Sequence, residues 1–288
     1  MGAAMMGMGA TLTVADFVAL VRDPRGLALG LVAHLLLLPA LAFAFARLLD
    51  LDTGWALGLY MVSVVPPGAM SNLLTFVGRG NAALSISITL AATLGCVVTA
   101  PLLLGFMAAA ELPADFALPA FDIIGEIAAY LIAPLLAGML LRHLRPAQAP
   151  AASRWLVRLA VVGLIVVASS SLASGRIRVL EYGVVPPLRI LAFGAAMTTG
   201  AGLLARVLGR PDRDVVALMV PAAIRNIAVS LILIQFFFPG TEVQAHILYT
   251  CLFYGGSSMF YVLPAVLRHR YGRGPLIFVP RRPVVEPE

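Results

Sequence analysis

The chain has 288 residues, of which 61% are hydrophobic and only 12% are charged. A soluble domain carries about 25% charged residues, so this composition, with a mean hydropathy of +0.97, excludes an ordinary water-soluble globule and also a disordered chain. Because a helix needs about 20 apolar residues to cross a bilayer, the length allows roughly eight to ten crossings, and we expect an all-α polytopic membrane protein.

Nine apolar stretches follow one another along the chain, separated by short polar segments. They cover residues 1–12, 26–46, 53–76, 81–110, 121–141, 155–174, 186–208, 215–238 and 243–267. The first is too short to span a membrane alone, and the other eight are long enough. Counting the first as an incomplete crossing, we predict about nine transmembrane helices.

The basic residues indicate how these helices are oriented. All 20 are arginines, and they are scattered between the apolar stretches rather than gathered in one patch, which argues against nucleic-acid binding. If the C-terminus is cytoplasmic, alternating crossings place fifteen arginines inside and three outside (Arg47, Arg176 and Arg178). The positive-inside rule therefore favours a multi-pass protein of the cell (inner) membrane with its N-terminus outside.

Two of the stretches carry the same interruption. Pro67 is followed five residues later by Asn72, and Pro221 is followed five residues later by Asn226. Three crossings lie between the two segments, so they run in opposite directions through the membrane. This pattern predicts an inverted repeat with two broken helices that cross near the bilayer midplane. A pair of ordinary proline kinks is the alternative.

No pattern in the chain indicates an enzyme. Cys96 and Cys251 lie inside apolar stretches and are not spaced as a metal site, so they are expected to be buried thiols. The stretches hold no Ser–His–acid set, no paired carboxylates and no cluster of metal ligands. We therefore expect neither catalysis nor a cofactor.

The stretch from Pro66 to Thr89 resembles the bile acid:sodium symporter family. Its motif is a Pro-Gly break followed by Ser71-Asn72, a short helix, Arg79-Gly80-Asn81, and then Ser85 and Thr89. The resemblance extends from about residue 9 to about residue 267. It implies transport of an organic anion coupled to sodium, with a core domain that holds two crossing broken helices and a panel domain that rocks against it.

The resemblance also divides the chain. It implies a core formed by residues 26–110 and 180–270, a panel formed by residues 1–25 and 121–174, and a cytoplasmic tail at 271–288. The helix breaks fall at Pro66, Pro67 and Gly68 in the first crossing helix and at Pro221 in the second.

One sodium site of the family has matching residues here, and one does not. The first site corresponds to Ser71, Asn72, Ser85 and Thr89, but the glutamate that completes it is replaced by Pro221. The second site uses the same glutamate and two glutamines, which are replaced by Arg225 and His34. This second site has therefore lost its ligands, whereas the first keeps its neutral oxygens.

Arg225 changes the chemistry expected at the crossing. Two like charges about 4 Å apart repel by about 4 kcal/mol at an effective dielectric constant near 20, which lowers cation affinity by roughly a thousandfold. We hypothesise that Arg225 replaces the lost sodium, with its donors on half-helix carbonyls or on a substrate carboxylate. The alternative is an arginine that reaches the membrane interface.

Other polar residues in the predicted core complete the candidate site. His34 is a candidate proton carrier or a hydrogen-bonded core histidine. Asn72 and Asn226 either bind substrate or orient the broken helix ends, and Ser71 joins them. By the resemblance, Tyr254 and Ser258 line the cavity.

We therefore expect a secondary transporter of a small organic anion, such as a bile-acid, pantoate or keto-acid-like carboxylate, that works by alternating access and without sodium. Two alternatives remain. One is a sodium-coupled symporter with a single ion at Ser71, Asn72, Ser85 and Thr89. The other is a degenerate protein that binds but does not transport. The expected partners are the substrate and the lipid bilayer, and the oligomeric state is not predicted.

Overall fold

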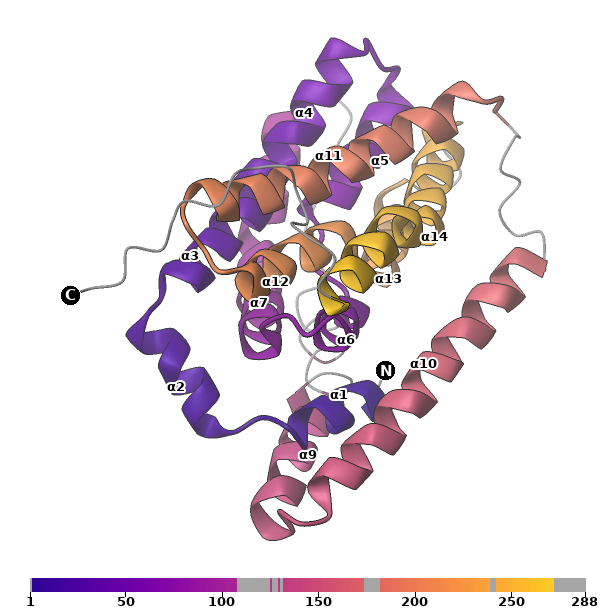
Figure 1. Ribbon diagram of the computed structural model, residues 1–288. Coiled ribbons are helices and arrows are strands. Elements are labelled where there is room, and N and C mark those ends of the chain that lie inside the picture. The colour runs from indigo at the N-terminus through magenta and orange to yellow at the C-terminus, as the bar shows by residue number, and fades with distance from the viewer. Residues whose placement is uncertain are drawn as a thin grey trace.

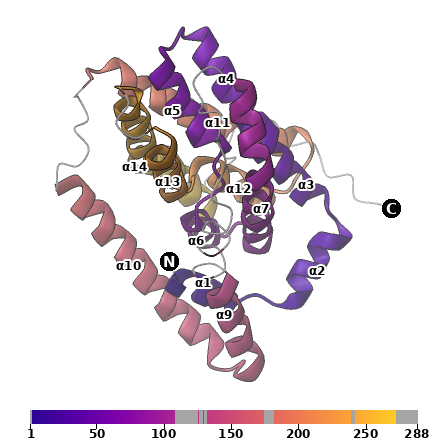
Figure 2. The same ribbon diagram turned by 180° about the vertical axis from the view of Figure 1, so that it is seen from behind.

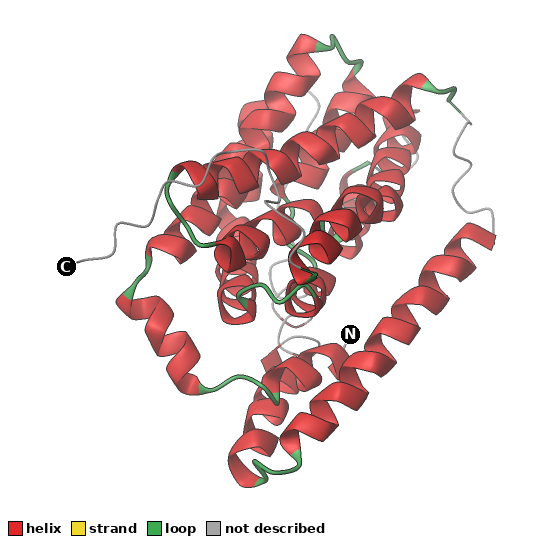
Figure 3. Ribbon diagram, viewed as in Figure 1, coloured by secondary structure: helices red, strands yellow, loops and turns green. Residues whose placement is uncertain are grey.

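The computed structural model describes residues 2–107, 125, 129, 132–173, 182–238 and 242–271. Within these residues every regular element is a helix, as Figures 1 and 3 show. The expectation of an all-helical protein is confirmed for this part of the chain. The loop predicted at 111–120, the beginning of the stretch predicted at 121–141, and the tail after residue 271 lie outside the described residues.

The chain begins with two short helices, α1 (Gly2–Gly9) and α2 (Val14–Arg22), which meet at an angle of 81°. α2 was not predicted from the sequence, although the sequence contains a capping motif that marks its start. Thr13 and Asp16 form a capping box, in which the Asp16 carboxylate accepts from the Thr13 backbone N–H at 2.7 Å. This reciprocal cap fixes the start of α2 and the sharp turn before it.

Three helices are long and apolar enough to cross a membrane: Arg25–Leu48, Val185–Val207 and Val243–Arg270. The first combines α3 (Arg25–Val32), one π-helical turn (Ala33–Leu37) and α4 (Leu38–Leu48). The other two belong to α11 (Val185–Val207) and α14 (Glu242–Arg270). The described residues give up to five spans if each of two bent helix pairs counts as one.

Both predicted crossing helices are broken. The first consists of α5 (Thr53–Val64) and α6 (Ala69–Val77), and its break contains Pro66, Pro67 and Gly68. The second consists of α12 (Asp212–Ala223) and α13 (Ile227–Phe237). Pro221 is not at this second break, which corrects the sequence prediction. It lies in the last turn of α12. The hydrogen bonds to the first break are made by Ile224 and Asn226, so the chain leaves the helix there.

The remaining helices are α7 (Ala82–Met107), α9 (Ala133–Leu144) and α10 (Ala149–Ala173). The predicted loop at 142–154 is shorter than expected, because both neighbouring helices extend into it. α1 packs against α9 and α10, and these three helices lie together at one side of the molecule (Figures 1 and 2). The other helices form a larger body, in which α5 packs along α14 and α11 packs along α12.

α1 and α9 approach each other closely at Gly138. A Cβ atom at this position would overlap the Met6 carbonyl oxygen and would lie 2.8 Å from the Ala10 nitrogen. We expect Gly138→Ala to lower the free energy of unfolding by about 1–3 kcal/mol, the usual cost of overpacking. Thermal melting of the purified protein in detergent measures this effect.

Gly163→Ala on α10 is the matched control, because a Cβ atom there meets nothing within 4 Å. It should leave the melting temperature unchanged or raise it slightly, since alanine favours a helix. Equal melting temperatures for the two variants would contradict the packing argument.

Candidate functional site at the helix crossing

The two helix breaks pair with each other in an antiparallel bridge between Pro67 and Arg225. The Gly68 N–H donates to the Ile224 carbonyl at 2.9 Å, and the Asn226 N–H donates to the Pro66 carbonyl at 2.9 Å. A Cβ atom on Gly68 would lie only 3.0 Å from the Arg225 carbonyl oxygen, so a glycine permits this close approach. The two interrupted helices thus meet at their breaks, and each break satisfies backbone groups of the other.

Arg225 extends from the second break to the C-terminal end of α5. Its Nε donates to the Val62 carbonyl at 3.1 Å, and its Nη2 donates to the carbonyls of Ser63, at 2.7 Å, and Val65. These carbonyls end a helix, where they have no partner in the helix itself and carry partial negative charge. The residue is 5% exposed. The guanidinium therefore occupies the place where a helix C-terminus would otherwise attract a cation.

Tyr254 on α14 binds the C-terminal end of α12, which is the other helix that ends at the crossing. It is completely buried, and its hydroxyl donates to the Ala223 carbonyl at the end of α12 at 2.9 Å. Ser258 is also buried, and its hydroxyl donates to the Gly255 carbonyl of its own helix at 2.8 Å. Neither residue is among those that line the cavity described below.

The predicted residues of the first sodium site come together in a buried cluster of oxygens. Asn72 Oδ1 accepts from the Ser85 hydroxyl at 2.7 Å and from the Thr89 hydroxyl at 3.1 Å. Ser71 lies in the same turn of α6 as Asn72, and all four residues are at most 2% exposed. The two hydroxyls satisfy the Asn72 oxygen, and none of the four side chains is a carboxylate.

The N-terminal end of α6 at the crossing carries side-chain donors without a partner in the described part of the chain, unlike the C-terminal ends of α5 and α12, whose carbonyls accept from Arg225 and Tyr254. Ser71 Oγ and Asn72 Nδ2, in the first turns of α6, are buried and have no hydrogen-bond partner among the described residues. Asn226 caps α13, because its side-chain oxygen accepts from the Val229 N–H at 3.4 Å. Helix N-termini favour anions, so the unpartnered donors of α6 point to an anionic ligand.

His34 lies in the π-helical turn and is 2% exposed. Its Nδ1 is 2.8 Å from the Gly30 carbonyl, so this nitrogen carries the proton in the neutral ring. Its Nε2 has no hydrogen-bond partner among the described residues, and the ring lies near the Pro221 backbone and the Arg225 guanidinium. π-Turns within α-helices occur frequently at functional sites.

A polar network fixes the far ends of both crossing helices. Asp214 at the start of α12 accepts from Asn81 Nδ2 at 2.8 Å and from Arg210 Nε at 3.0 Å. Arg210 also donates to Asp23 at 3.1 Å, and this hydrogen bond holds the pKa of the Asp23 carboxyl below its usual value. The ionised form of Asp23 is thereby favoured, so its small contribution to stability is present above about pH 4 and lost at lower pH.

Sequence reasoning did not find every residue of the site. Thr75 Oγ1 lies 3.3 Å from Ser85 Oγ, and the Thr93 hydroxyl donates to the Thr89 carbonyl at 2.5 Å. The spacing of four residues between Ser85, Thr89 and Thr93 is the signal that would have extended the polar face along α7. The carbonyls that accept from Arg225 belong to the backbone, so no residue type in the sequence identifies them. Among the described residues, no group of three His, Cys, Asp or Glu side chains has the arrangement of a metal site.

The sequence of this chain also matches known proteins. Residues 1–181 match the model of the Sodium Bile acid symporter family. The "Uncharacterized sodium-dependent transporter YocS" of Bacillus subtilis is 33% identical over 183 residues, which cover 64% of this chain and 56% of that protein. The "Probable sodium/metabolite cotransporter BASS2, chloroplastic" of Oryza sativa is 40% identical over 117 residues, 41% of this chain and 28% of that protein.

A third relative matches over more of the chain. The "Probable sodium/metabolite cotransporter BASS1, chloroplastic" of Oryza sativa is 26% identical over 257 residues, which cover 88% of this chain and 62% of that protein. The chain thus spans between about a quarter and three fifths of the length of these three curated relatives.

Proposed function

Because this chain belongs to the sodium bile acid symporter family, we propose that it is a secondary transporter of a small organic anion and that Arg225 replaces a sodium ion at the helix crossing. The substrate is a carboxylate of the bile-acid, pantoate or keto-acid kind. It binds near the paired breaks, and the binding site is exposed alternately to the two sides of the membrane. The names of two relatives describe a sodium-dependent transporter and a sodium/metabolite cotransporter. The proposal that this chain transports without sodium rests on its own residues.

The observation that carries the proposal is the position of the Arg225 guanidinium. It donates to three carbonyls at the C-terminal end of α5, and it puts a fixed positive charge at the position of a residue that binds sodium in the family. A second cation about 4 Å away would be repelled by about 4 kcal/mol at an effective dielectric constant near 20. No carboxylate pairs with Arg225 among the described residues, so its charge is available to an anionic substrate.

The proposed substrate ligands surround the N-terminal ends of α6 and α13, which are the half-helices that follow the two breaks. Ser71 and Asn72 supply unpartnered donors from α6, and Asn226 supplies the amide of its cap on α13. Arg225 Nη1 and His34 Nε2, which are also buried without partners among the described residues, complete a set with four donors and one acceptor. Such a set suits a carboxylate with a neighbouring hydroxyl or keto group.

The proposed architecture is nine crossings arranged as an inverted repeat. The antiparallel pairing of the two breaks supports the repeat. The packing of α1 on α9 and α10 supports a panel formed by residues 1–25 and 121–174, which moves against a core formed by residues 26–110 and 180–270. The arginine distribution supports a cytoplasmic C-terminus, an outer N-terminus and the cell (inner) membrane.

A second candidate function retains one sodium ion. The oxygen atoms of Asn72, Ser85 and Thr89 lie together, and Ser71 adjoins them, so a weakly bound ion would find neutral ligands there. This candidate is less favoured because the cluster holds no carboxylate, and a hard cation prefers at least one anionic oxygen.

Uptake into proteoliposomes distinguishes the two functions. The purified protein is reconstituted, and uptake of a panel of radiolabelled carboxylates is measured under a sodium gradient alone, a pH gradient alone, or neither. We expect uptake that responds to a pH gradient or to substrate exchange and is the same with sodium or choline outside. Uptake that requires sodium would establish the second candidate, and no uptake of any carboxylate would contradict transport.

A further inference from the structure

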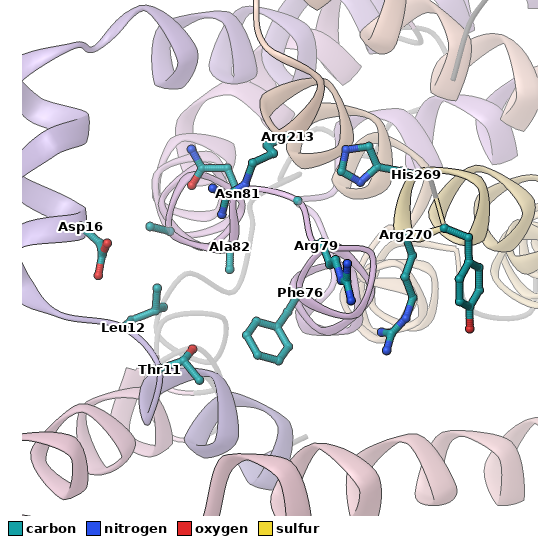
Figure 4. Close-up of a pocket in the computed structure, with 13 residues that line it drawn as sticks. Thr11, Leu12, Asp16, Phe76, Arg79, Asn81, Ala82, Arg213, His269 and Arg270 are labelled. Atoms are coloured by element: carbon teal, nitrogen blue, oxygen red, sulfur yellow. The ribbon is translucent and has the colours of Figure 1, made fainter. Parts of the chain in front are cut away.

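A large cavity opens beside the turn that joins α6 to α7, away from the paired breaks. Its volume is about 1050 Å³, and it is bounded by the link between α1 and α2, the α6–α7 turn, the start of α12 and the end of α14 (Figure 4). Phe76 on its wall is four residues from Asn72 on α6, or about 6 Å along the helix axis. The cavity therefore lies about one helical turn beyond Asn72, toward the end of α6 that is away from the paired breaks, and it is lined by different residues.

The charged residues of this cavity are mostly cationic. Arg79, Arg213, His269 and Arg270 line it, and Asp16 is the one acid among its lining residues. The Asp16 carboxylate already accepts from the Thr13 N–H and hydroxyl at 2.7 Å each. The acid is thus held in the capping box, and its single negative charge leaves the positive charge of the arginines in excess.

The basic residues divide into two pairs with different roles. His269 lies 2.7 Å from the Gly78 carbonyl through Nδ1, and Arg270 donates to the Val77 carbonyl at 2.7 Å, so this pair caps the C-terminal end of α6. The guanidinium groups of Arg79 and Arg213 have no hydrogen-bond or ion-pair partner among the described residues. Both residues are exposed to the cavity, and Figure 4 shows both side chains on its wall.

The backbone holds this second pair in place. The Asn81 N–H donates to the Arg213 carbonyl at 2.9 Å, which ties the α6–α7 turn to the start of α12. Arg79 has a φ of 58°, a left-handed conformation that is uncommon for a residue with a side chain. This conformation ends α6 in a Schellman motif, in which the Arg79 N–H donates to the Phe76 carbonyl at 3.0 Å and the Gly80 N–H donates to the Thr75 carbonyl at 2.8 Å.

We propose that Arg79 and Arg213 form a second anion site, which binds a dianionic oxyanion such as a phosphate group. Two planar guanidinium groups offer paired donors that match phosphate oxygens, and together they balance the two charges of the group. The phosphate belongs to a free metabolite or to a lipid with a phosphomonoester headgroup, such as phosphatidic acid, at the membrane surface. The site does not depend on the proposed transport function.

The test uses the full chain in nanodiscs of phosphatidylcholine, with thermal melting as the readout. Inorganic phosphate is titrated against chloride at constant ionic strength. We expect phosphate to raise the melting temperature of the wild type, and Arg79→Gln with Arg213→Gln to raise the half-saturating phosphate concentration by about tenfold, the effect of about 1.4 kcal/mol. A parallel measurement replaces part of the lipid by phosphatidic acid, whose headgroup is a phosphomonoester. Stabilisation by this lipid alone, lost in the double variant, would identify the headgroup as the source.

Two control variants make the result specific. Arg154→Gln removes an exposed arginine on α10, far along the chain from the cavity, and should leave the phosphate response unchanged. Asn72→Ala changes the substrate site, and it should reduce carboxylate uptake without changing the phosphate response. Equal responses of the wild type and the double variant, or equal losses in Arg154→Gln or Asn72→Ala, would overturn the proposal. A wild type that responds to neither phosphate nor the anionic lipid would overturn it as well.

Discussion

Replacing Arg225 by glutamine is expected to destabilise the protein and to reduce substrate uptake at least tenfold. The variant loses hydrogen bonds to three carbonyls. Bonds from a charged donor contribute about 1.5–3 kcal/mol each, or roughly 4–9 kcal/mol together. Removing an unpaired arginine from the middle of a span returns only about 2.5–3.5 kcal/mol. The balance is a loss of about 1–6 kcal/mol, which thermal melting in detergent measures.

The effect of sodium on the melting temperature distinguishes a purely structural role of Arg225 from its replacement of a sodium ion. Without the guanidinium, the carbonyl ends of α5 are free to attract a cation. We therefore expect sodium, but not choline, to raise the melting temperature of Arg225→Gln and to have no such effect on the wild type. Arg225→Lys is the matched control, because it keeps the charge but loses the planar fork that reaches several carbonyls. It should be destabilised without responding to sodium. Unchanged uptake by Arg225→Gln would remove the idea that this residue acts in transport.

The general architecture could be predicted from the sequence because the membrane limits the choices. Apolar stretches of sufficient length can only form helices in lipid, so the helical class followed from composition. The existence of two breaks was predicted from the repeated pattern of a proline followed five residues later by an asparagine. Pro67 lies in the first break, whereas the second break lies at Ile224–Asn226, beyond Pro221. The residue at which each helix ends was harder to predict from the sequence. α12 continues past Pro221 to Ala223, since the first break supplies the partners that let the chain leave the helix later.

The candidate site was predictable only where side chains form it. Asn72, Ser85 and Thr89 were found from their spacing and from the family resemblance, and the structure brings them within hydrogen-bonding distance. The partners of Arg225 are backbone carbonyls, which every residue carries, so no sequence pattern could identify them. The cavity beside Arg79 and Arg213 depends on residues more than 130 positions apart in the chain, and its contacts arise only from tertiary packing.

Asn72→Asp is expected to abolish anion transport while preserving the fold. The substitution keeps the shape of the side chain, and one oxygen still accepts from Ser85 and Thr89. The unpartnered Nδ2 donor becomes a second oxygen with negative charge, which the N-terminal end of α6 tolerates. A substrate carboxylate about 4 Å away would be repelled by about 4 kcal/mol at an effective dielectric constant near 20, which corresponds to roughly a thousandfold loss of affinity. Uptake in proteoliposomes measures the loss.

The same variant should acquire a response to sodium that the wild type lacks. The new carboxylate adds the anionic oxygen that the cluster of Ser71, Asn72, Ser85 and Thr89 does not have, and hard cations favour such ligands. We expect sodium to raise the melting temperature of Asn72→Asp. Asn226→Asp makes the same change at the other break, where the side chain caps α13 and aspartate caps equally well, so it should show no response. If sodium stabilises the wild type as strongly as Asn72→Asp, the neutral oxygens already bind an ion, and the charge of Arg225 does not exclude it.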